Sequence, residues 1–238
     1  MRINMSLLKC DFRVVGPIQT NCYFLYREDT KECLIIDPGY EADKIEAYVQ
    51  KKQLHVAGIL LTHGHFDHVE ALKEVAEKYN APIYMNKNEI DFMKNDEVRK
   101  KFQTKIYASG KEKELMADPR MNVSVMMGES VSLKADVWLE DGQELEMLGE
   151  TMRCILTPGH TGGGMCFYFP KACMLFSGDT LFQESVGRTD FPTGSMSTLV
   201  RSVKEKLFTL PEDTVVYPGH DDSTTIGHEK KYNPFCVD

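Results

Sequence analysis

The segment Thr62-His63-Gly64-His65-Phe66-Asp67-His68 places three imidazoles and one carboxylate within a short stretch of chain. It follows the apolar run 56–61, which predicts a buried strand that ends where this segment begins. Imidazole nitrogens and carboxylate oxygens are ligands that zinc, iron and manganese take in proteins. The segment therefore predicts a metal site at the end of a rigid element.

Three more apolar, strand-like runs lead through Gly or Pro to a histidine or an aspartate, at His160, Asp179 and His220. In open α/β sheets, sites gather at the carboxyl ends of strands, so we expect these loops to meet. Five of the chain's seven histidines fall in these loops and the segment 62–68 taken together, which random placement would not produce. The predicted ligands are His63, His65, Asp67, His68, His160, Asp179 and His220.

Seven ligands are too many for one tetrahedral zinc, and structural zinc sites are closed by four ligands that are usually rich in Cys. We expect two divalent ions, with zinc the first candidate and iron or manganese the alternatives. The predicted groups are His63, His65 and His160 for one ion, and Asp67, His68 and His220 for the other, with Asp179 bridging. Two such ions would hold a hydroxide between them as nucleophile and polarise a carbonyl, with Asp67 and Asp179 as the catalytic carboxylates.

Two histidines are not expected to bind metal. His55 precedes the strand and is predicted to lie at the surface, and His228 is predicted to make a local hydrogen bond. The seven cysteines are scattered, with no Cys-x-x-Cys pair and no activating neighbour, so we expect reduced thiols in a cytoplasmic protein.

Composition limits the possible partners of the chain. With 238 residues, 42% of them hydrophobic, residues 1–238 are expected to form one domain with a sizeable core. The net charge of −8 and the lack of a basic stripe argue against nucleic-acid binding. No run is long enough to predict a membrane span or a signal peptide, so the expected partner is a small-molecule substrate.

Strand and helix patterns alternate along the chain, which predicts the α/β class. Helical spacing covers 41–50, 69–79 and 198–210, and Asp141-Gly142 predicts a hairpin between strands 137–139 and 145–148. Other predicted strands are 14–15, 22–26, 33–36, 83–85, 152–156, 173–176 and 214–217, and 91–119 is a charged insert expected to lie over the surface.

The motifs His63-Gly64-His65-Phe66-Asp67-His68, Pro158-Gly159-His160-Thr161, Gly178-Asp179-Thr180, Gly187-Arg188-Thr189-Asp190-Phe191 and Pro218-Gly219-His220 resemble, in this order, those of the metallo-β-lactamase superfamily. Within it, the chain is similar to the glyoxalase II-like small bacterial metallohydrolases. The resemblance implies a four-layer αββα sandwich with a dimetal site at one edge. It also implies hydrolysis of a small thioester.

Two features of the sequence leave other activities open. Glyoxalase II has an additional C-terminal helical region that supplies basic residues to glutathione, and this sequence ends about where that region begins. The loop 187–191 is also similar to one in the persulfide dioxygenases, which share the fold and use one iron, although Pro192 replaces their usual Gln. A persulfide dioxygenase, a lactonase and a metal-binding protein without activity therefore remain alternatives, whereas β-lactam hydrolysis is not expected.

Arg188 is the predicted substrate-binding residue, because an anionic thiol carrier needs a cation and a guanidinium forms a planar fork suited to a carboxylate. The alternative is an ion pair with Asp190 that braces the loop.

Overall fold

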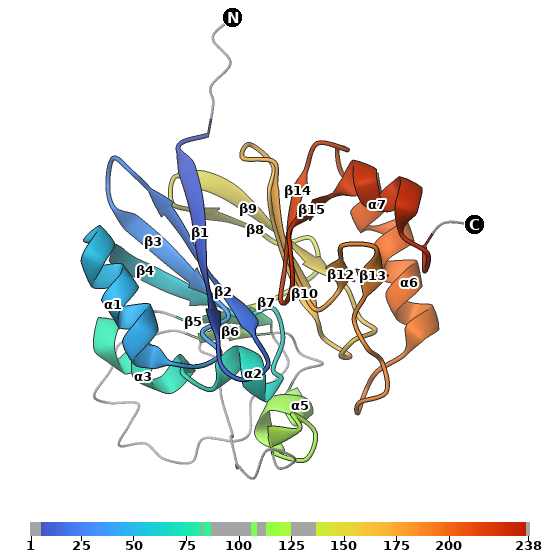
Figure 1. Cartoon of the computed structure of the whole chain (residues 1–238), viewed down its shortest axis with the longest axis horizontal. Coiled ribbons are helices and arrows are strands. Elements are labelled where there is room, and N and C mark those ends of the chain that lie inside the picture. The colour runs from blue at the N-terminus through green and yellow to red at the C-terminus, as the bar shows by residue number, and fades with distance from the viewer. Residues whose placement is uncertain (1–5, 82, 87–105, 109–112, 125–136, 237–238) are drawn as a thin grey trace, which may run out of the picture.

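Two mixed sheets face each other and carry helices on their outer faces (Figure 1). The computed structural model describes residues 6–81, 83–86, 106–108, 113–124 and 137–236. The four-layer αββα architecture predicted from the sequence is confirmed by this arrangement. The charged insert 91–119 lies mostly outside the described residues, and its predicted role remains a prediction.

The first sheet has the order β1-β2-β3-β4-β5-β6, with β7 also paired to β5. Its strands are β1 (Leu8–Val15), β2 (Thr20–Arg27), β3 (Glu32–Ile36), β4 (His55–Leu60), β5 (Ile83–Asn86), β6 (Ile106–Ala108) and β7 (Val137–Leu139). Strands β3, β4 and β5 run parallel, so their carboxyl ends meet at one edge. The helices that follow β3 and β4 are α1 (Ala42–Lys52), α2 (Phe66–Val69) and α3 (Leu72–Tyr79), and α5 (Lys113–Ala117) comes later.

The second sheet has the order β15-β14-β11-β10-β9-β8. Its strands are β8 (Glu144–Met147), β9 (Glu150–Leu156), β10 (Met165–Phe169), β11 (Met174–Gly178), β14 (Val215–Pro218) and β15 (Thr224–Thr225), and β12 (Leu181–Phe182) pairs separately with β13 (Ser185–Val186). Strands β9, β11 and β14 point the same way, since β10 is antiparallel to both β9 and β11. Helices α6 (Met196–Glu205) and α7 (Ile226–Tyr232) and the 3-10 turn Leu207–Thr209 cover this sheet.

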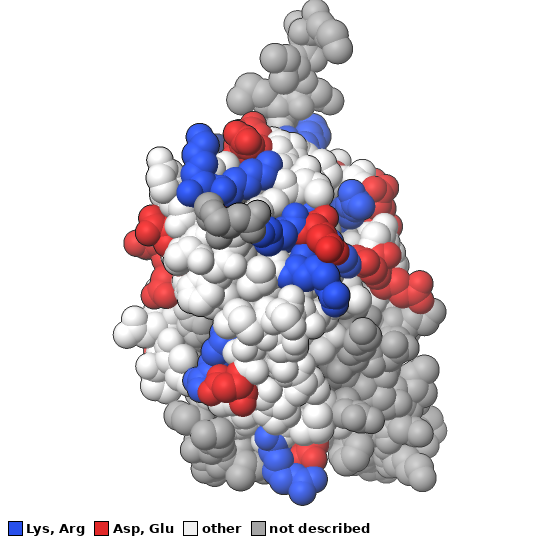
Figure 2. Space-filling view, turned by 90° about the vertical axis from the view of Figure 1, so that its right-hand side faces the viewer, with Lys and Arg blue, Asp and Glu red and all other residues white. Residues whose placement is uncertain are grey.

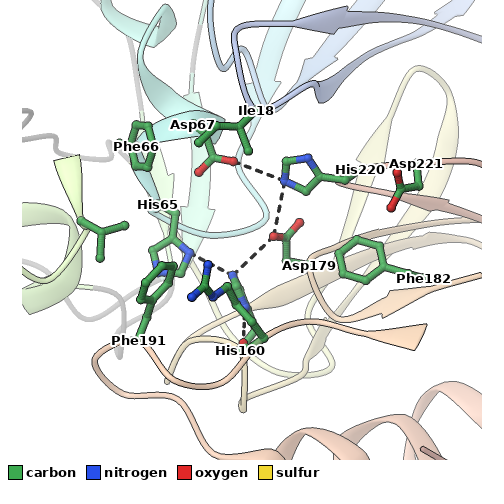
Figure 3. A pocket seen from close by; sticks show the side chains of 12 residues that line it. Ile18, His65, Phe66, Asp67, His160, Asp179, Phe182, Phe191, His220 and Asp221 are labelled. Atoms are coloured by element: carbon green, nitrogen blue, oxygen red, sulfur yellow. Dashed lines mark hydrogen bonds and ion pairs between the residues drawn. The ribbon is translucent and has the colours of Figure 1, made fainter. Parts of the chain in front are cut away.

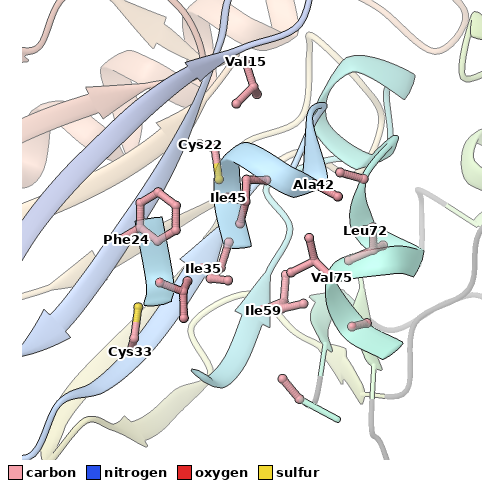
Figure 4. Packing of buried hydrophobic residues seen from close by; sticks show 14 of the residues in the cluster. Val15, Cys22, Phe24, Cys33, Ile35, Ala42, Ile45, Ile59, Leu72 and Val75 are labelled. Atoms are coloured by element: carbon pink, nitrogen blue, oxygen red, sulfur yellow. The ribbon is translucent and has the colours of Figure 1, made fainter. Parts of the chain in front are cut away.

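Alternation along β2 shows how the layers are filled. Phe24 packs outward against α1 and α3, in the cluster drawn in Figure 4, whereas Tyr23 and Leu25 point into the space between the sheets. Successive side chains of a strand point to opposite faces, so a strand covered on both sides is apolar throughout. The carboxyl ends of β4, β9, β11 and β14 are thereby held at one edge by a rigid core.

Two local predictions are wrong. The turn at Asp141-Gly142 makes no hairpin, because β7 pairs with β5 in the first sheet and β8 pairs with β9 in the second. The hairpin lies one turn later, where Leu148 and Gly149, with φ of 53° and 71°, join β8 to β9 in a two-residue loop suited to positive φ.

The predicted helix 69–79 is interrupted at its start. Helix α2 ends at Val69 and α3 begins at Leu72. The backbone N–H of Ala71 donates to the carbonyl oxygens of Pro38 (3.2 Å) and Gly39 (2.9 Å), in the loop after β3. A tertiary hydrogen bond thus replaces an intrahelical one, and α2 turns toward the edge where the strands end.

Candidate metal centre

The seven predicted ligands lie together at this edge, brought by the loops that follow β4, β9, β11 and β14. Figure 3 shows those that line the cavity, which are His65, Asp67, His160, Asp179 and His220. Their ligand atoms form three overlapping groups in which all atoms lie within 4.8 Å of one another. The groups are His63, His65 and His160; His63, His68 and Asp179; and Asp67, His68 and His220. The structure therefore assembles the complete predicted set, and His55 and His228 belong to none of these groups.

Three imidazoles form the first group. Nδ1 of His65 lies 3.1 Å from Nε2 of His63 and 2.9 Å from Nε2 of His160, and the two Nε2 atoms are 3.3 Å apart. Tetrahedral zinc with Zn–N bonds near 2.0–2.1 Å separates its nitrogens by about 3.3 Å. Three nitrogens this close, all buried, fit one metal ion.

Asp67, His68 and His220 form the second group. Oδ2 of Asp67 lies 3.3 Å from Nε2 of His220 and 3.5 Å from Nε2 of His68. Asp179 reaches both groups: its Oδ1 is 3.4 Å from His68 Nε2, and its Oδ2 is 3.5 Å from His160 Nε2. This placement is the one that a bridging carboxylate needs.

Buried polar atoms in this cluster are left without ordinary partners. Nε2 of His68 and Oδ1 of Asp179 make no hydrogen bond to any described residue. Buried donors and acceptors are normally paired, and an unpaired one points to an ion or a ligand. Gly219 keeps the space beside these two atoms open, because a Cβ there would collide with Asp179 Oδ1 and crowd the His68 ring. The donor set and its free space fit divalent metal ions.

Hydrogen bonds on the far side of the rings fix their tautomers. Nδ1–H of His68 donates to Oδ2 of Asp37 (2.9 Å), and Nδ1–H of His160 donates to the carbonyl oxygen of Arg188 (2.7 Å). His63 Nδ1 donates to Thr62 Oγ1 (3.1 Å), whose own hydrogen goes to Asp37 (2.6 Å). Each bond leaves the Nε2 lone pair directed at the cluster, as metal-binding histidines require.

Asp37 is a functional residue that the sequence analysis missed. It is buried, and its Oδ1 also accepts from the Thr62 backbone N–H (2.8 Å). In the sequence, Asp37-Pro38-Gly39 suggested only a turn. Asp37 nevertheless follows the end of an apolar strand, as the ligand loops do, and that pattern was the available signal.

Burial and neighbouring charges shift the pKa values of the side chains in the cluster. Burial lowers the pKa of His63 well below its usual value and that of His65 to about 3, so both rings are neutral at pH 7. Burial also disfavours a charged His68, but the neighbouring carboxylates outweigh burial and raise its pKa. Burial opposes ionisation of Asp179, yet His68, His160 and His220 together lower its pKa well below the usual range. Neutral imidazoles and ionised carboxylates are the forms that bind metal, so His63, His65 and Asp179 are ready for a cation, whereas His68 must release a proton when it binds one.

A cavity of about 580 Å³ opens on the ligands (Figure 3). Its described walls combine polar side chains of the cluster with apolar and aromatic ones. They are Ile18, His65, Phe66, Asp67, Val123, His160, Asp179, Phe182, Arg188, Phe191, His220 and Asp221. The sequence analysis quoted Phe66 and Phe191 only as parts of motifs, and it missed Ile18, Val123 and Phe182 as wall residues, because they come from separate loops.

Arg188 lines this cavity and is also paired with Asp190. Its Nε and Nη2 donate to the two carboxylate oxygens at 2.8 and 2.7 Å, and its guanidinium carbon lies 3.9 Å from the centre of the Phe191 ring. Arg188 therefore has both the cavity position expected of a substrate-binding residue and the ion pair expected of a residue that braces the loop.

The remaining sequence predictions concern residues away from the cluster. His228 Nε2 lies 3.0 Å from Oε1 of Glu184, so the side chain makes a hydrogen bond away from the metal ligands as predicted, although its partner is 44 residues distant and not local. All seven cysteines are free, and burial raises the pKa of Cys166 to about 11, so its thiol is not a ready nucleophile. Within the described chain, no helix is both long and apolar enough to span a bilayer.

The αββα sandwich, the cluster of His and Asp side chains at its strand ends and the relatives described below indicate a metal-dependent hydrolase. The family model of the metallo-β-lactamase superfamily matches residues 15–220, and the chain belongs to that superfamily.

Two relatives in sequence cover almost the whole chain. The chain is 41% identical to the probable metallo-hydrolase YqgX of Bacillus subtilis, over 93% of this chain and 94% of the relative. It is 32% identical to the hydroxyacylglutathione hydrolase GloC of Haemophilus influenzae, with the same coverage.

Two solved structures are also similar. One is described as the BLEG-1 B3 metallo-β-lactamase, with a TM-score of 0.83, 36% identity, and coverage of 97% of this chain and 100% of the other. The second is TTHA1623 in a di-iron-bound form, with a TM-score of 0.75, 31% identity, and coverage of 94% and 99%.

Proposed function

We propose that this chain is a dinuclear metallohydrolase that cleaves a small thioester, as glyoxalase II-like enzymes do. One observation carries the proposal: two three-ligand groups joined by Asp179 open on a cavity of about 580 Å³. The described walls of that cavity contain no Ser, Cys or Lys that could act as a nucleophile instead. The likeness to a hydroxyacylglutathione hydrolase supports the thioester as substrate class.

In this proposal His63, His65 and His160 hold one ion, Asp67, His68 and His220 hold the second, and Asp179 contacts both. Two divalent ions bound there would lower the pKa of a shared water towards neutrality and polarise a thioester carbonyl. Asp67 lines the cavity and accepts a hydrogen bond from Thr20 Oγ1 (3.2 Å), so its carboxylate has a fixed orientation toward a bound substrate.

The side chains of the cavity walls also indicate which chemical groups the substrate contains. Phe182 and Phe191 flank the ligands on two sides of the cavity, and Ile18 lies across from them (Figure 3). Such surfaces bind the apolar part of a small molecule, while a few polar groups fix its orientation. On the face shown in Figure 2, basic and acidic side chains are interspersed, which differs from the clustered basic surface of nucleic-acid-binding proteins.

Metal analysis together with a substrate panel tests the proposal. We expect two ions per chain, and turnover of thioesters well above that of lactones, phosphoesters and β-lactams. β-Lactams belong in the panel because a structure 36% identical to this chain is described as a B3 metallo-β-lactamase. Because bound ions exchange during purification, zinc-, iron- and manganese-loaded protein should be assayed separately.

A persulfide dioxygenase is the second candidate, favoured by the loop 187–191. One iron per chain with oxygen uptake on a persulfide would support it over hydrolysis. Metal-loaded protein that turns over no member of the panel and takes up no oxygen with a persulfide would contradict both enzymatic proposals.

Arg188→Ala should raise KM for a carboxylate-bearing thioester about fivefold, with little change for a neutral one. The cost is about 1 kcal/mol, which is below the range of about 1.5–3 kcal/mol for a hydrogen bond to a charged group, since Arg188 is half exposed and already shared with Asp190. Steady-state kinetics on both substrates and a melting curve measure this. Asp190→Ala is the matched control: equal losses on both substrates and a lowered melting temperature in both variants would reduce Arg188 to a brace.

A further inference from the structure

Asn21 ties the first sheet to the loop that carries His220. It lies in β2, is buried, and is separated from that loop by about two hundred residues of sequence. Its backbone N–H donates to the carbonyl oxygen of Gly219 (2.7 Å), and its Nδ2 donates to those of Pro218 (3.2 Å) and Asp221 (2.9 Å). The side chain and the backbone N–H of Asn21 thus bind residues on both sides of His220.

Two neighbours of Asn21 complete this contact. The hydroxyl of Tyr23 donates to the carbonyl oxygen of Pro218 at 2.6 Å, and Asn21 Nδ2 lies 3.2 Å from the same hydroxyl. Thr20, the residue before Asn21, donates from Oγ1 to Oδ2 of Asp67. Adjacent residues of a strand face opposite ways, so Thr20 and Asn21 can each reach a different loop.

The two loops that these residues hold come from different sheets. Asp67 follows β4 in the first sheet, and His220 follows β14 in the second. Asp67 and His220 belong to the same ligand group, so its geometry depends on how the two sheets are joined at this edge. Among the described residues, no such hydrogen bond links β2 to the three-histidine group of His63, His65 and His160.

We propose that Asn21, with Tyr23 and Thr20, is a positioning device for the second metal position, setting the separation of His220 from Asp67. It acts through the backbone around His220 and contacts no reacting atom. The inference rests on the two-position metal site proposed above. Groups that orient metal ligands change metal affinity by about 10- to 100-fold when they are removed, so the effect should be large and confined to one position.

The test titrates wild type, Asn21→Ala and Tyr23→Phe with zinc against a competing chelator, and records the visible spectrum of the cobalt(II) forms. We expect one tight ion in every protein. The second ion should bind about 10- to 100-fold more weakly in Asn21→Ala and less severely so in Tyr23→Phe, with altered cobalt bands for that ion alone. If Asn21→Ala does not fold, Tyr23→Phe decides, because it removes one hydroxyl and keeps the ring.

Asn233→Ala is the matched control. Asn233 is also fully buried, and its Nδ2 donates to the carbonyl oxygen of Ser185 (3.0 Å) and to Glu229 (2.8 Å), away from the metal ligands. It should lower the melting temperature without changing either metal affinity. Unchanged affinities in Asn21→Ala and Tyr23→Phe, or equal losses at both positions, would overturn the positioning role. A wild type that binds one ion would overturn the two-position site itself, and the positioning role with it.

Discussion

Asp179→Ala should lower metal occupancy at both positions, which no other single ligand change is expected to do. Asp179 is the residue whose two oxygens face both groups, at 3.4 Å from His68 Nε2 and 3.5 Å from His160 Nε2. Its removal takes a ligand from each ion and leaves Asp67 as the one carboxylate in the ligand groups that offsets the positive charge of the ions. We expect less than one ion per chain after dialysis, and loss of turnover, measured by elemental analysis and thioester assay.

Asp221→Asn is the control for Asp179→Ala. Asp221 lines the same cavity but belongs to none of the ligand groups, and its φ of 60° is one that asparagine tolerates well. It should keep the metal content of the wild type. One tightly held ion in wild type that Asp179→Ala leaves in place would contradict the two-metal site.

The clustering of the seven predicted ligands could be foreseen from the sequence, because each of them follows an apolar run. A buried strand and the loop after it are both local patterns, and parallel strands bring such loops to one edge. His160 and His220 illustrate this: nothing near them in sequence identifies a partner, but the strand before each fixes its place. The alternation of strands and helices predicted only the α/β class, and the four-layer architecture was implied by the resemblance of the ordered motifs to the metallo-β-lactamase superfamily.

The failed predictions depended on partners distant in sequence. Asp141-Gly142 has the composition of a hairpin turn, but a turn does not determine which sheet the next strand joins. The helical spacing of 69–79 continues through Ala71, yet the carbonyl oxygens of Pro38 and Gly39 interrupt the helix there. Both errors reflect tertiary contacts that override a correct local pattern.

The residues that orient the ligands were hidden for the same reason. Asp37 and Asn21 act through His68 and through the loop around His220, at separations of 31 residues and of about two hundred. Their types, Asp before Pro-Gly and Asn within a strand, each have an ordinary structural meaning. Only the assembled edge of the two sheets shows that they touch the metal ligands or their loops.

Asp67→Asn should lower kcat about 10²-fold or more, while the fold and the three-histidine group stay intact. Aspartate offers acceptors on both oxygens, and Oδ2 of Asp67 faces Thr20 Oγ1, His220 Nε2 and His68 Nε2. Asparagine keeps the shape, but one of its two positions becomes an NH₂ donor and the negative charge is lost. Whichever way the amide turns, a metal ligand or the group that orients the reacting water is removed.

Turnover and metal content of Asp67→Asn must be measured on the same preparation, because loss of the second ion alone would also lower kcat. Protein reloaded to two ions per chain separates the two effects, and the orienting role requires that kcat stay low after reloading. Asp213→Asn, the same change of charge on the exposed loop before β14, should keep wild-type values in both measurements. Near-wild-type turnover in fully loaded Asp67→Asn would leave Asp67 a ligand at most, and would move the catalytic role to Asp179, whose carboxylate is the other one in the cluster that faces the cavity.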